Sequence, residues 1–531
     1  MRRAILLTLA LAALWAAPAA AREVVDASAP TALAVTLYRD PDRAADQAMD
    51  RSDPRGFAMI SETRTVTLPP GESTIRFEGV AEGMVGVTAI VTGLPGGAIE
   101  KNRNADLLSP GALVDGTLGN RVTITRTNPA TGQQESESAI VRTRADGGLV
   151  LQTAAGFEAV GCAGVPEKLT FDRVPAGLSA QPVFTIDTRD PKGGTYTVTL
   201  TYLAWGFDWQ AHYVATVDEG GKGDAMRLKL MSWLTLLNDN GQSFPGAELM
   251  AVAGRLNVTS DYQSLADPPE AKPLRLVCYP LGHTWTGSPV YRQSYDFAPP
   301  PPAPAALAGS IVVTAERRAD AQLKTMNSPL LAKEEALGDL KLYRVPERVT
   351  VSAKGLKQVA FLDKDSVRGK LVYQSSCEWR DTDEDPAAAR MRFETVNDEK
   401  HGLGVSLPQG GITFFEPSSR GDLFVGEQQL RDYASGQDVE IELGQSAQVF
   451  ATCADEGGDP GKGWARLKTT LSNANPHPVT LRLKLGSPQQ WRVRGLKGTT
   501  VKDGETAVLV TVPANATREV AWSVRNADAE D

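Results

Sequence analysis

Strict alternation of apolar and polar residues is the feature that most restricts how this chain can fold. In "TYTVTLTY" (195–202), four apolar or aromatic residues share one face of the segment and four threonines share the other. A period of two is typical of a β-strand with one buried side and one side in water. The same period recurs in four further segments, 121–126, 226–230, 438–443 and 479–485.

Clusters of Gly, Pro, Asn and Asp separate these segments, as at 128–132, 190–194 and 238–241. Such clusters mark turns between short strands. The only segment that favours a helix is 321–340. We therefore predict a mainly β fold, made of several antiparallel β-sandwich or small-barrel domains with a Pro-rich insertion and little helix.

The chain is longer than one hydrophobic core usually supports, so we expect several domains. The predicted units are a signal peptide at 1–21, an N-terminal β module at 22–105, a small SH3-like β barrel at 107–180, a core β-sandwich at 185–375 interrupted by an insertion at 262–336, and a C-terminal β-sandwich at 388–531.

The first residues have the order of a secretory signal peptide. Arg2 and Arg3 precede an apolar run at 4–17, and three alanines at 19–21 precede Arg22. This order of charge, apolar core and small residues predicts export, most simply to the periplasm. We expect no transmembrane segment after signal removal, since no later run approaches the roughly 18 apolar residues of a spanning helix.

The formal net charge of −9 argues against nucleic acid as the main partner, because nucleic acid binding rewards a basic surface.

Several blocks of this sequence resemble one bacterial family. "YLAWGFDWQAHYVATVDE" (202–219), "LGDLKLYRVPERVTV" (337–351), "GLGVSLPQGGITFFE" (402–416) and "LFVGEQQL" (423–430) look like the core and C-terminal blocks of the mucoidy-inhibitor-A-like proteins. The resemblance implies an uncharacterised envelope protein with a mostly β fold. It looks like the short variant, without the coiled coil that many members carry. It implies no reaction and no catalytic residue.

Metal and nucleophile signatures are missing from the sequence. Its four histidines, His212, His283, His401 and His477, are far apart, and no short metal-binding spacing occurs. No nucleophile elbow of the G-x-S-x-G type is present. We predict no catalytic residue, no metal site and no cofactor.

Four cysteines could form disulfides in an oxidising compartment: Cys162, Cys278, Cys377 and Cys453. Four cysteines allow three complete pairings, and the sequence does not choose among them or exclude free buried thiols.

Three aromatic residues recur every four positions, Trp205, Trp209 and Tyr213. One hypothesis is an aromatic platform for a carbohydrate or a peptide. The alternative is core packing, because rings of this size bury a large apolar area. Gly206 favours a turn within the segment.

The segment "PPPPAPAALAGSIVVTAERR" (299–318) joins a polyproline spacer to a β-prone peptide. Residues 311–318 look like the box through which outer-membrane receptors contact the protein TonB. In this hypothesis, Ile311, Val312, Val313 and Thr314 add a strand to the edge of TonB. The alternative is a tetrad that pairs within its own domain or stays disordered.

The sequence as a whole indicates an exported, non-enzymatic, multidomain β protein of the cell envelope that binds envelope proteins or glycans. The alternative function is a hydrolase that acts on envelope polymers. A pocket with converging carboxylates would favour the hydrolase, and exposed edge strands or aromatic patches would favour binding.

Overall fold

The computed structural model describes residues 22–103, 106–145, 148–160, 166–175, 178–218, 224–266, 274 and 331–528. It confirms the predicted mainly β class, with several sandwich-like sheets. The predicted signal peptide (1–21) and the Pro-rich arm (299–318) lie outside the described residues.

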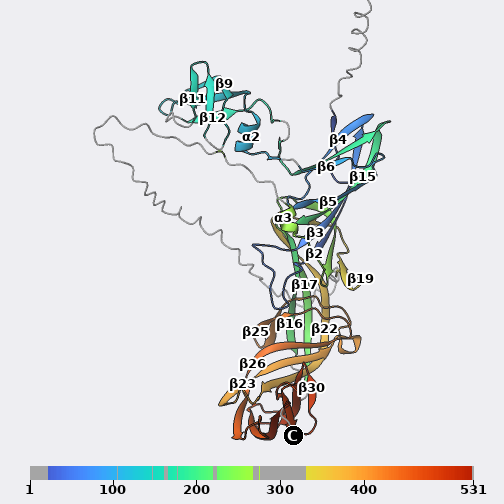
Figure 1. The fold of residues 1–531 in the computed structure, drawn as a ribbon, viewed down its shortest axis with the longest axis vertical. Coiled ribbons are helices and arrows are strands. Elements are labelled where there is room, and N and C mark those ends of the chain that lie inside the picture. The colour runs from blue at the N-terminus through green and yellow to red at the C-terminus, as the bar shows by residue number, and fades with distance from the viewer. Residues whose placement is uncertain are drawn as a thin grey trace, which may run out of the picture.

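An eight-stranded sheet, called sheet one here, forms the middle of the molecule in Figure 1. Its strands are β2 (Ala32–Tyr38), β3 (Phe57–Leu68), β5 (Met84–Thr92), β15 (Gly194–Trp205), β18 (Phe244–Ala253), β19 (Lys333–Leu337), β20 (Leu340–Arg344) and β21 (Val349–Val351). β3 pairs with β15 over the whole length of both strands. The predicted boundary between 22–105 and 185–375 therefore does not separate two sheets.

Two smaller assemblies lie above sheet one in Figure 1. A four-stranded sheet consists of β1 (Glu23–Asp26), β4 (Gly71–Glu78), β6 (Glu100–Asn102) and β14 (Val183–Asp190). Its neighbour contains α2 (Pro110–Gly116), the pair β7 (Asp106–Leu107) and β13 (Leu178–Ser179), and the five strands β8 (Arg121–Thr127), β9 (Gln134–Val141), β10 (Val150–Thr153), β11 (Gly156–Ala159) and β12 (Glu167–Thr170). In Figure 1 this neighbour stands to one side of the main body.

The predicted small barrel at 107–180 is an open sheet in the described residues. Its order is β11-β10-β9-β8-β12, and β11 and β12 are the two ends. Arg126 on β8 forms ion pairs with Glu158 on β11 and Glu167 on β12, but no backbone pairing joins β11 to β12 among the described residues. The barrel part of the prediction is therefore wrong.

A thirteen-stranded sheet, called sheet two here, continues to the C-terminus at the bottom of Figure 1. It contains β16 (Phe207–Asp218), β17 (Ala225–Asn238), β22 (Gly355–Ser376), β23 (Asp383–Val396), β24 (Gly410–Ser418), β25 (Gly421–Leu430), β26 (Asp438–Gly457), β27 (Ala465–Asn473), β28 (Val479–Lys484), β29 (Trp491–Arg494), β30 (Thr500–Lys502), β31 (Glu505–Val512) and β32 (Ala516–Asn526), with the 3₁₀ turn η3 at Glu399–His401.

Long strands join two hydrophobic cores within this body. The larger core spans sheet one and the first half of sheet two, from Leu33 to Ile441, and the smaller core spans Tyr373 to Val524. β22 and β26 contribute residues to both cores. The predicted boundary near 375–388 is therefore crossed by strands that run from one core into the other.

The chain enters sheet two at Gly206. β15 ends at Trp205 and β16 begins at Phe207, and Gly206 between them has φ +84°. Residues with a Cβ rarely adopt this φ, so glycine suits the point where the strand leaves sheet one. The turn that the sequence predicted here is confirmed.

The predicted helix at 321–340 is wrong over its described part. Lys333–Leu337 forms β19 and pairs with β20 through a tight turn that contains Gly338, whose φ is +60°. Pairing with the edge of sheet one outweighs the modest helix preference of the residues "KEEAL".

The described residues contain one further helix, the short α3 (Tyr262–Ala266). Neither α2 nor α3 is long and apolar enough to cross a membrane, and no other described segment supplies such a helix.

Candidate functional site

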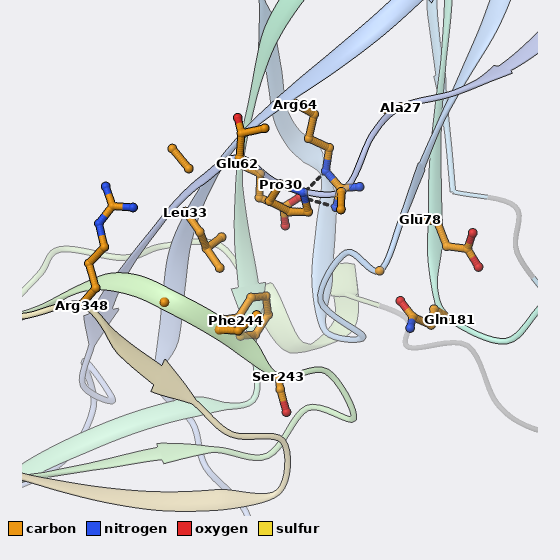
Figure 2. A pocket seen from close by; sticks show the side chains of 16 residues that line it. Ala27, Pro30, Leu33, Glu62, Arg64, Glu78, Gln181, Ser243, Phe244 and Arg348 are labelled. Carbon is orange, nitrogen blue, oxygen red and sulfur yellow. Dashed lines mark hydrogen bonds and ion pairs between the residues drawn. The ribbon is translucent and has the colours of Figure 1, made fainter.

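A groove of about 730 Å³ opens where two parallel strands of sheet one diverge. β2 and β18 pair from Ala34 and Glu248 onward, and the residues before that point line the groove. Figure 2 shows Leu33 and Phe244 on its apolar side, with Glu62 and Arg64 of β3 above them. The groove is therefore a consequence of where the two strands stop pairing.

The floor of the groove holds a buried ion pair. Glu62 and Arg64 lie two residues apart on β3, on the face that also carries Ile60 and Val66, and both are almost fully buried. The Arg64 Nε and Nη2 groups donate to Glu62 Oε2 at 2.8 and 2.6 Å. Figure 2 draws these contacts as dashed lines.

Two further hydrogen bonds hold this pair in place. The Tyr202 hydroxyl donates to Glu62 Oε1 at 2.8 Å, and Arg64 Nη1 donates to the Ser28 carbonyl at 3.1 Å. Burial and the neighbouring Glu62 carboxylate raise the pKa of Tyr202 well above its usual value. Tyr202 therefore remains a neutral donor, and both oxygens of Glu62 are engaged.

The charges at the rim of the groove are paired as well. Ser179 donates its hydroxyl to Glu78 at 2.6 Å, and Arg348 donates to Glu248 at 3.0 Å. In Figure 2, Glu78 and Gln181 lie on the side opposite Arg348. This arrangement of compensated charges suits recognition by hydrogen bonds better than transfer of a proton.

Two carboxylates lie side by side in sheet two. A pair of carboxylates is what a glycoside hydrolase would need. Glu394 on β23 and Glu440 on β26 are cross-strand partners. Arg482 Nη2 donates to Glu394 at 2.9 Å, Arg392 Nη1 donates to Glu440 at 3.2 Å, and Lys502 forms ion pairs with both carboxylates.

The cations around this pair favour the ionised form of Glu440. Burial opposes the ionisation of Glu440, but Lys502, Arg482 and Arg392 outweigh burial and lower its pKa. A glycoside hydrolase needs one carboxylic acid with a raised pKa to protonate the leaving group. The Glu394–Glu440 pair therefore has the properties of a structural ion network.

An exposed apolar hairpin tip protrudes at the edge of sheet two. β25 is the end strand of the sheet and pairs with β24 on one side only within the described strands. Three consecutive residues of β25 are exposed, Leu423, Phe424 and Val425, with 56%, 60% and 48% of their surface accessible. Phe415 on β24 packs edge-on against Phe424 at 6.3 Å.

The turn of this hairpin is fixed by local hydrogen bonds. The Ser418 hydroxyl donates to the Gly421 carbonyl at 2.6 Å and accepts from the Arg420 amide at 3.2 Å. Val425 is an extra residue in the register, since Phe414 pairs with Gly426 and Phe415 with Phe424. A bulge of this kind turns side chains outward at an edge. We call residues 415–425 the hairpin tip.

The three aromatic residues of the predicted platform differ in their burial. Trp209 and Tyr213 are fully buried on β16, where the Tyr213 hydroxyl donates to the Pro408 carbonyl at 2.7 Å. The platform hypothesis is wrong for these two residues, because alternation on a strand directs both rings into the core. Trp205 is half-buried at the end of β15.

Cys377 and Cys453 form a disulfide. This is one of the pairs that the sequence allowed, while Cys162 and Cys278 lie outside the described residues.

The histidines show no metal site in the described part of the chain. His212 lies on β16 with Nε2 3.4 Å from the Thr413 hydroxyl, and His401 Nδ1 lies 2.7 Å from Asp398. His477 is exposed, and His283 is not among the described residues. No group of three or more metal-ligating side chains occurs among those residues.

The proposed TonB-contacting residues, Ile311, Val312, Val313 and Thr314, also lie outside the described residues. The structure therefore does not place them near any of the sites above.

The sequence contained signals for two sites that alternation alone did not identify. In "ISETRTVTL" (60–68), Glu62 and Arg64 occupy the apolar positions of an alternating strand. In "LFV" (423–425), three apolar residues in a row interrupt the alternation. The first departure coincides with the buried ion pair, and the second coincides with the exposed run of the hairpin tip.

Comparison with known proteins identifies no family and no relative. No family model matches this chain, and no curated protein matches it either.

Proposed function

We propose that this protein is an exported, non-enzymatic protein of the cell envelope that binds a protein partner through the hairpin tip. The observation that carries the proposal is the run Leu423-Phe424-Val425, exposed on the end strand of sheet two. Edge strands with exposed apolar residues are sites where another chain adds, and native proteins usually blunt them.

The geometry of the tip suits addition of an extended peptide. Among the described strands β25 pairs with β24 alone, and the exposed side chains of Leu423 and Phe424 supply apolar contact. Because these three side chains are about half exposed, completing their burial contributes roughly 1 kcal/mol each before the cost of association.

The hydrolase alternative has weaker support. The buried carboxylate of the groove, Glu62, is engaged by Arg64 and Tyr202, and the Glu394–Glu440 pair is held by cations. These contacts favour binding over acid–base chemistry in both places.

Export and family also belong to this proposal. Residues 1–21 support a periplasmic location, and the blocks at 202–219 and 402–430 support membership of the mucoidy-inhibitor-A-like family. A second contact, with TonB through residues 311–318, fits the same location. Its support is the sequence of those residues.

Site-specific photo-crosslinking in cells tests the hairpin tip. We expect a crosslinker at position 423 to capture a defined envelope protein, and Phe424→Ser to abolish that product. Leu509→Ser is the matched control, since Leu509 is equally exposed at 60% but lies on β31. The proposal fails if Phe424→Ser and Leu509→Ser leave the same product.

A deletion of residues 299–320 separates the arm from the tip. Loss of a TonB crosslink on deletion, with the product at position 423 unchanged, supports two independent contacts. An unchanged set of partners after the deletion refutes the contact with TonB through residues 311–318.

A further inference from the structure

Four aromatic rings meet at the end of sheet one, on the face away from the larger core. Tyr38 on β2 and Trp205 on β15 are both cross-strand partners of Phe57 on β3, so the three side chains share one face. The rings of Tyr38 and Phe57 stack at 4.9 Å, and Tyr262 of α3 meets Phe57 edge-on at 5.2 Å. The pairing register thus assembles an aromatic row from three strands.

This row borders a pocket of about 370 Å³ that is lined by Phe57, Trp205 and Tyr262 on its aromatic side. Its volume is at the lower end of the roughly 300–1,000 Å³ typical of small-molecule sites. The pocket therefore has room for a ligand the size of one or two sugar rings.

Three carboxylates line the polar side of the same pocket: Asp40, Asp42 and Asp261. Asp40 accepts a hydrogen bond from the Asp42 amide at 2.9 Å, and Asp261 accepts one from the Ser264 amide at 3.1 Å. These bonds orient the carboxylates of Asp40 and Asp261.

One cation, Arg55, also lines the pocket. It lies 3.6 Å from Asp53, and its charge adds to the Ser264 hydrogen bonds that lower the pKa of Asp261. The lining residues therefore carry three negative charges against one positive charge, which favours a cationic ligand.

From this geometry we propose that the pocket binds an amino sugar, with its ring on Trp205 and its ammonium group among Asp40, Asp42 and Asp261. The apolar face of a sugar ring packs against an aromatic side chain, and carboxylates accept hydrogen bonds from both ammonium and hydroxyl groups. Thr259, Ser260 and Gln263 supply further hydrogen-bonding groups at the rim. An acidic sugar would be repelled by the same carboxylates.

This inference does not depend on the hairpin tip, which lies on a different sheet. A partner protein at the tip can be lost while the pocket binds its sugar, and the reverse also holds. The two proposals therefore fail separately.

Isothermal titration calorimetry with glucosamine on the full mature chain tests the pocket, under mildly acidic conditions that keep the amine protonated. N-acetylglucosamine and glucuronic acid serve as comparison ligands. We expect glucosamine to bind most tightly and glucuronic acid not to bind. Trp205→Ala and Asp42→Asn should each raise the Kd for glucosamine about tenfold.

Two further variants give opposite expectations. Arg55→Gln removes the repelling cation and should lower the Kd, whereas Asp46→Asn changes an exposed carboxylate of the same loop outside the pocket lining and should leave the Kd unchanged. Asp42 is exposed, so Asp42→Asn should fold normally even if Trp205→Ala does not.

The proposal is overturned if glucosamine does not bind or binds no better than N-acetylglucosamine. It is equally overturned if Asp42→Asn and Asp46→Asn give the same Kd.

Discussion

At the residue scale, Asp208 is the buried carboxylate whose environment has the clearest consequence. It is almost fully buried at the start of β16, where Arg43 from the loop between β2 and β3 forms an ion pair with it. The amide of Trp209 donates to Asp208 Oδ1 at 2.7 Å, and the amide of Asp40 at 3.3 Å. Burial raises the pKa of Asp208 to about 6, against the opposing effect of Arg43 and the two amides.

This raised pKa makes stability depend on pH. The folded protein retains a proton on Asp208 between the ordinary pKa of an aspartate and about 6, whereas the unfolded chain releases it. Stability from this group is therefore fully present at low pH and is lost as pH rises from about 4 to about 6, on the order of 3 kcal/mol in total.

Thermal unfolding of the wild type and Asp208→Asn checks this expectation. The melting temperature of the wild type should exceed that of the variant by more at about pH 4.5 than at about pH 7.5. A difference between the two proteins that does not change with pH contradicts the raised pKa.

At the element scale, the hairpin tip depends on how closely β24 approaches β16. These strands pair in parallel, and Gly410 lies opposite Ala211. A Cβ at Gly410 would lie 1.9 Å from the Ala211 carbonyl oxygen, which belongs to the backbone and cannot move aside. Glycine at this position allows the whole hairpin to dock on sheet two.

Gly410→Ala should therefore destabilise the protein by about 3 kcal/mol, since overpacking in a rigid backbone contact forces the strands apart. Thermal unfolding gives the loss, and hydrogen exchange should show faster exchange of the amides of β24 and β25.

Gly463→Ala is the control for this change, because a Cβ at Gly463 meets no atom within 4 Å. If the two alanine variants melt together, close strand approach at Gly410 is not what holds the hairpin.

At the scale of the whole molecule, two cores share long strands, and a disulfide closes the smaller one. Cys377 follows β22 directly and Cys453 lies in β26, so the bond joins two elements that run through both cores. The bond spans 76 residues of sequence. A cross-link over a loop of that length restricts the unfolded chain substantially.

Replacing both Cys377 and Cys453 with Ala should cost about 2–5 kcal/mol, mainly in the smaller core. Hydrogen exchange provides the measurement, with β27, β28, β31 and β32 exchanging faster while β2 and β3 of sheet one serve as the internal reference. Equal acceleration in both regions would show that the two cores unfold as one unit.

The sequence by itself determined the strands. Alternation is a local property, so "TYTVTLTY" could be assigned to a strand, and the turn at Gly206 could be placed, without knowledge of any partner. The mainly β class followed from the same local signal. In "KEEAL" at 333–337 every residue is a good helix former, so the sequence indicated a helix, but pairing at a sheet edge decided otherwise.

Only the tertiary structure decided which strands are neighbours. Tyr38, Phe57 and Trp205 are distant in sequence, and they form one aromatic row because the register of β2, β3 and β15 aligns them. Pairing register depends on contacts between distant segments, which no local pattern specifies. For the same reason the sequence predicted separate domains where β3 and β15 build a single sheet, and it did not reveal that β25 would be left at an edge.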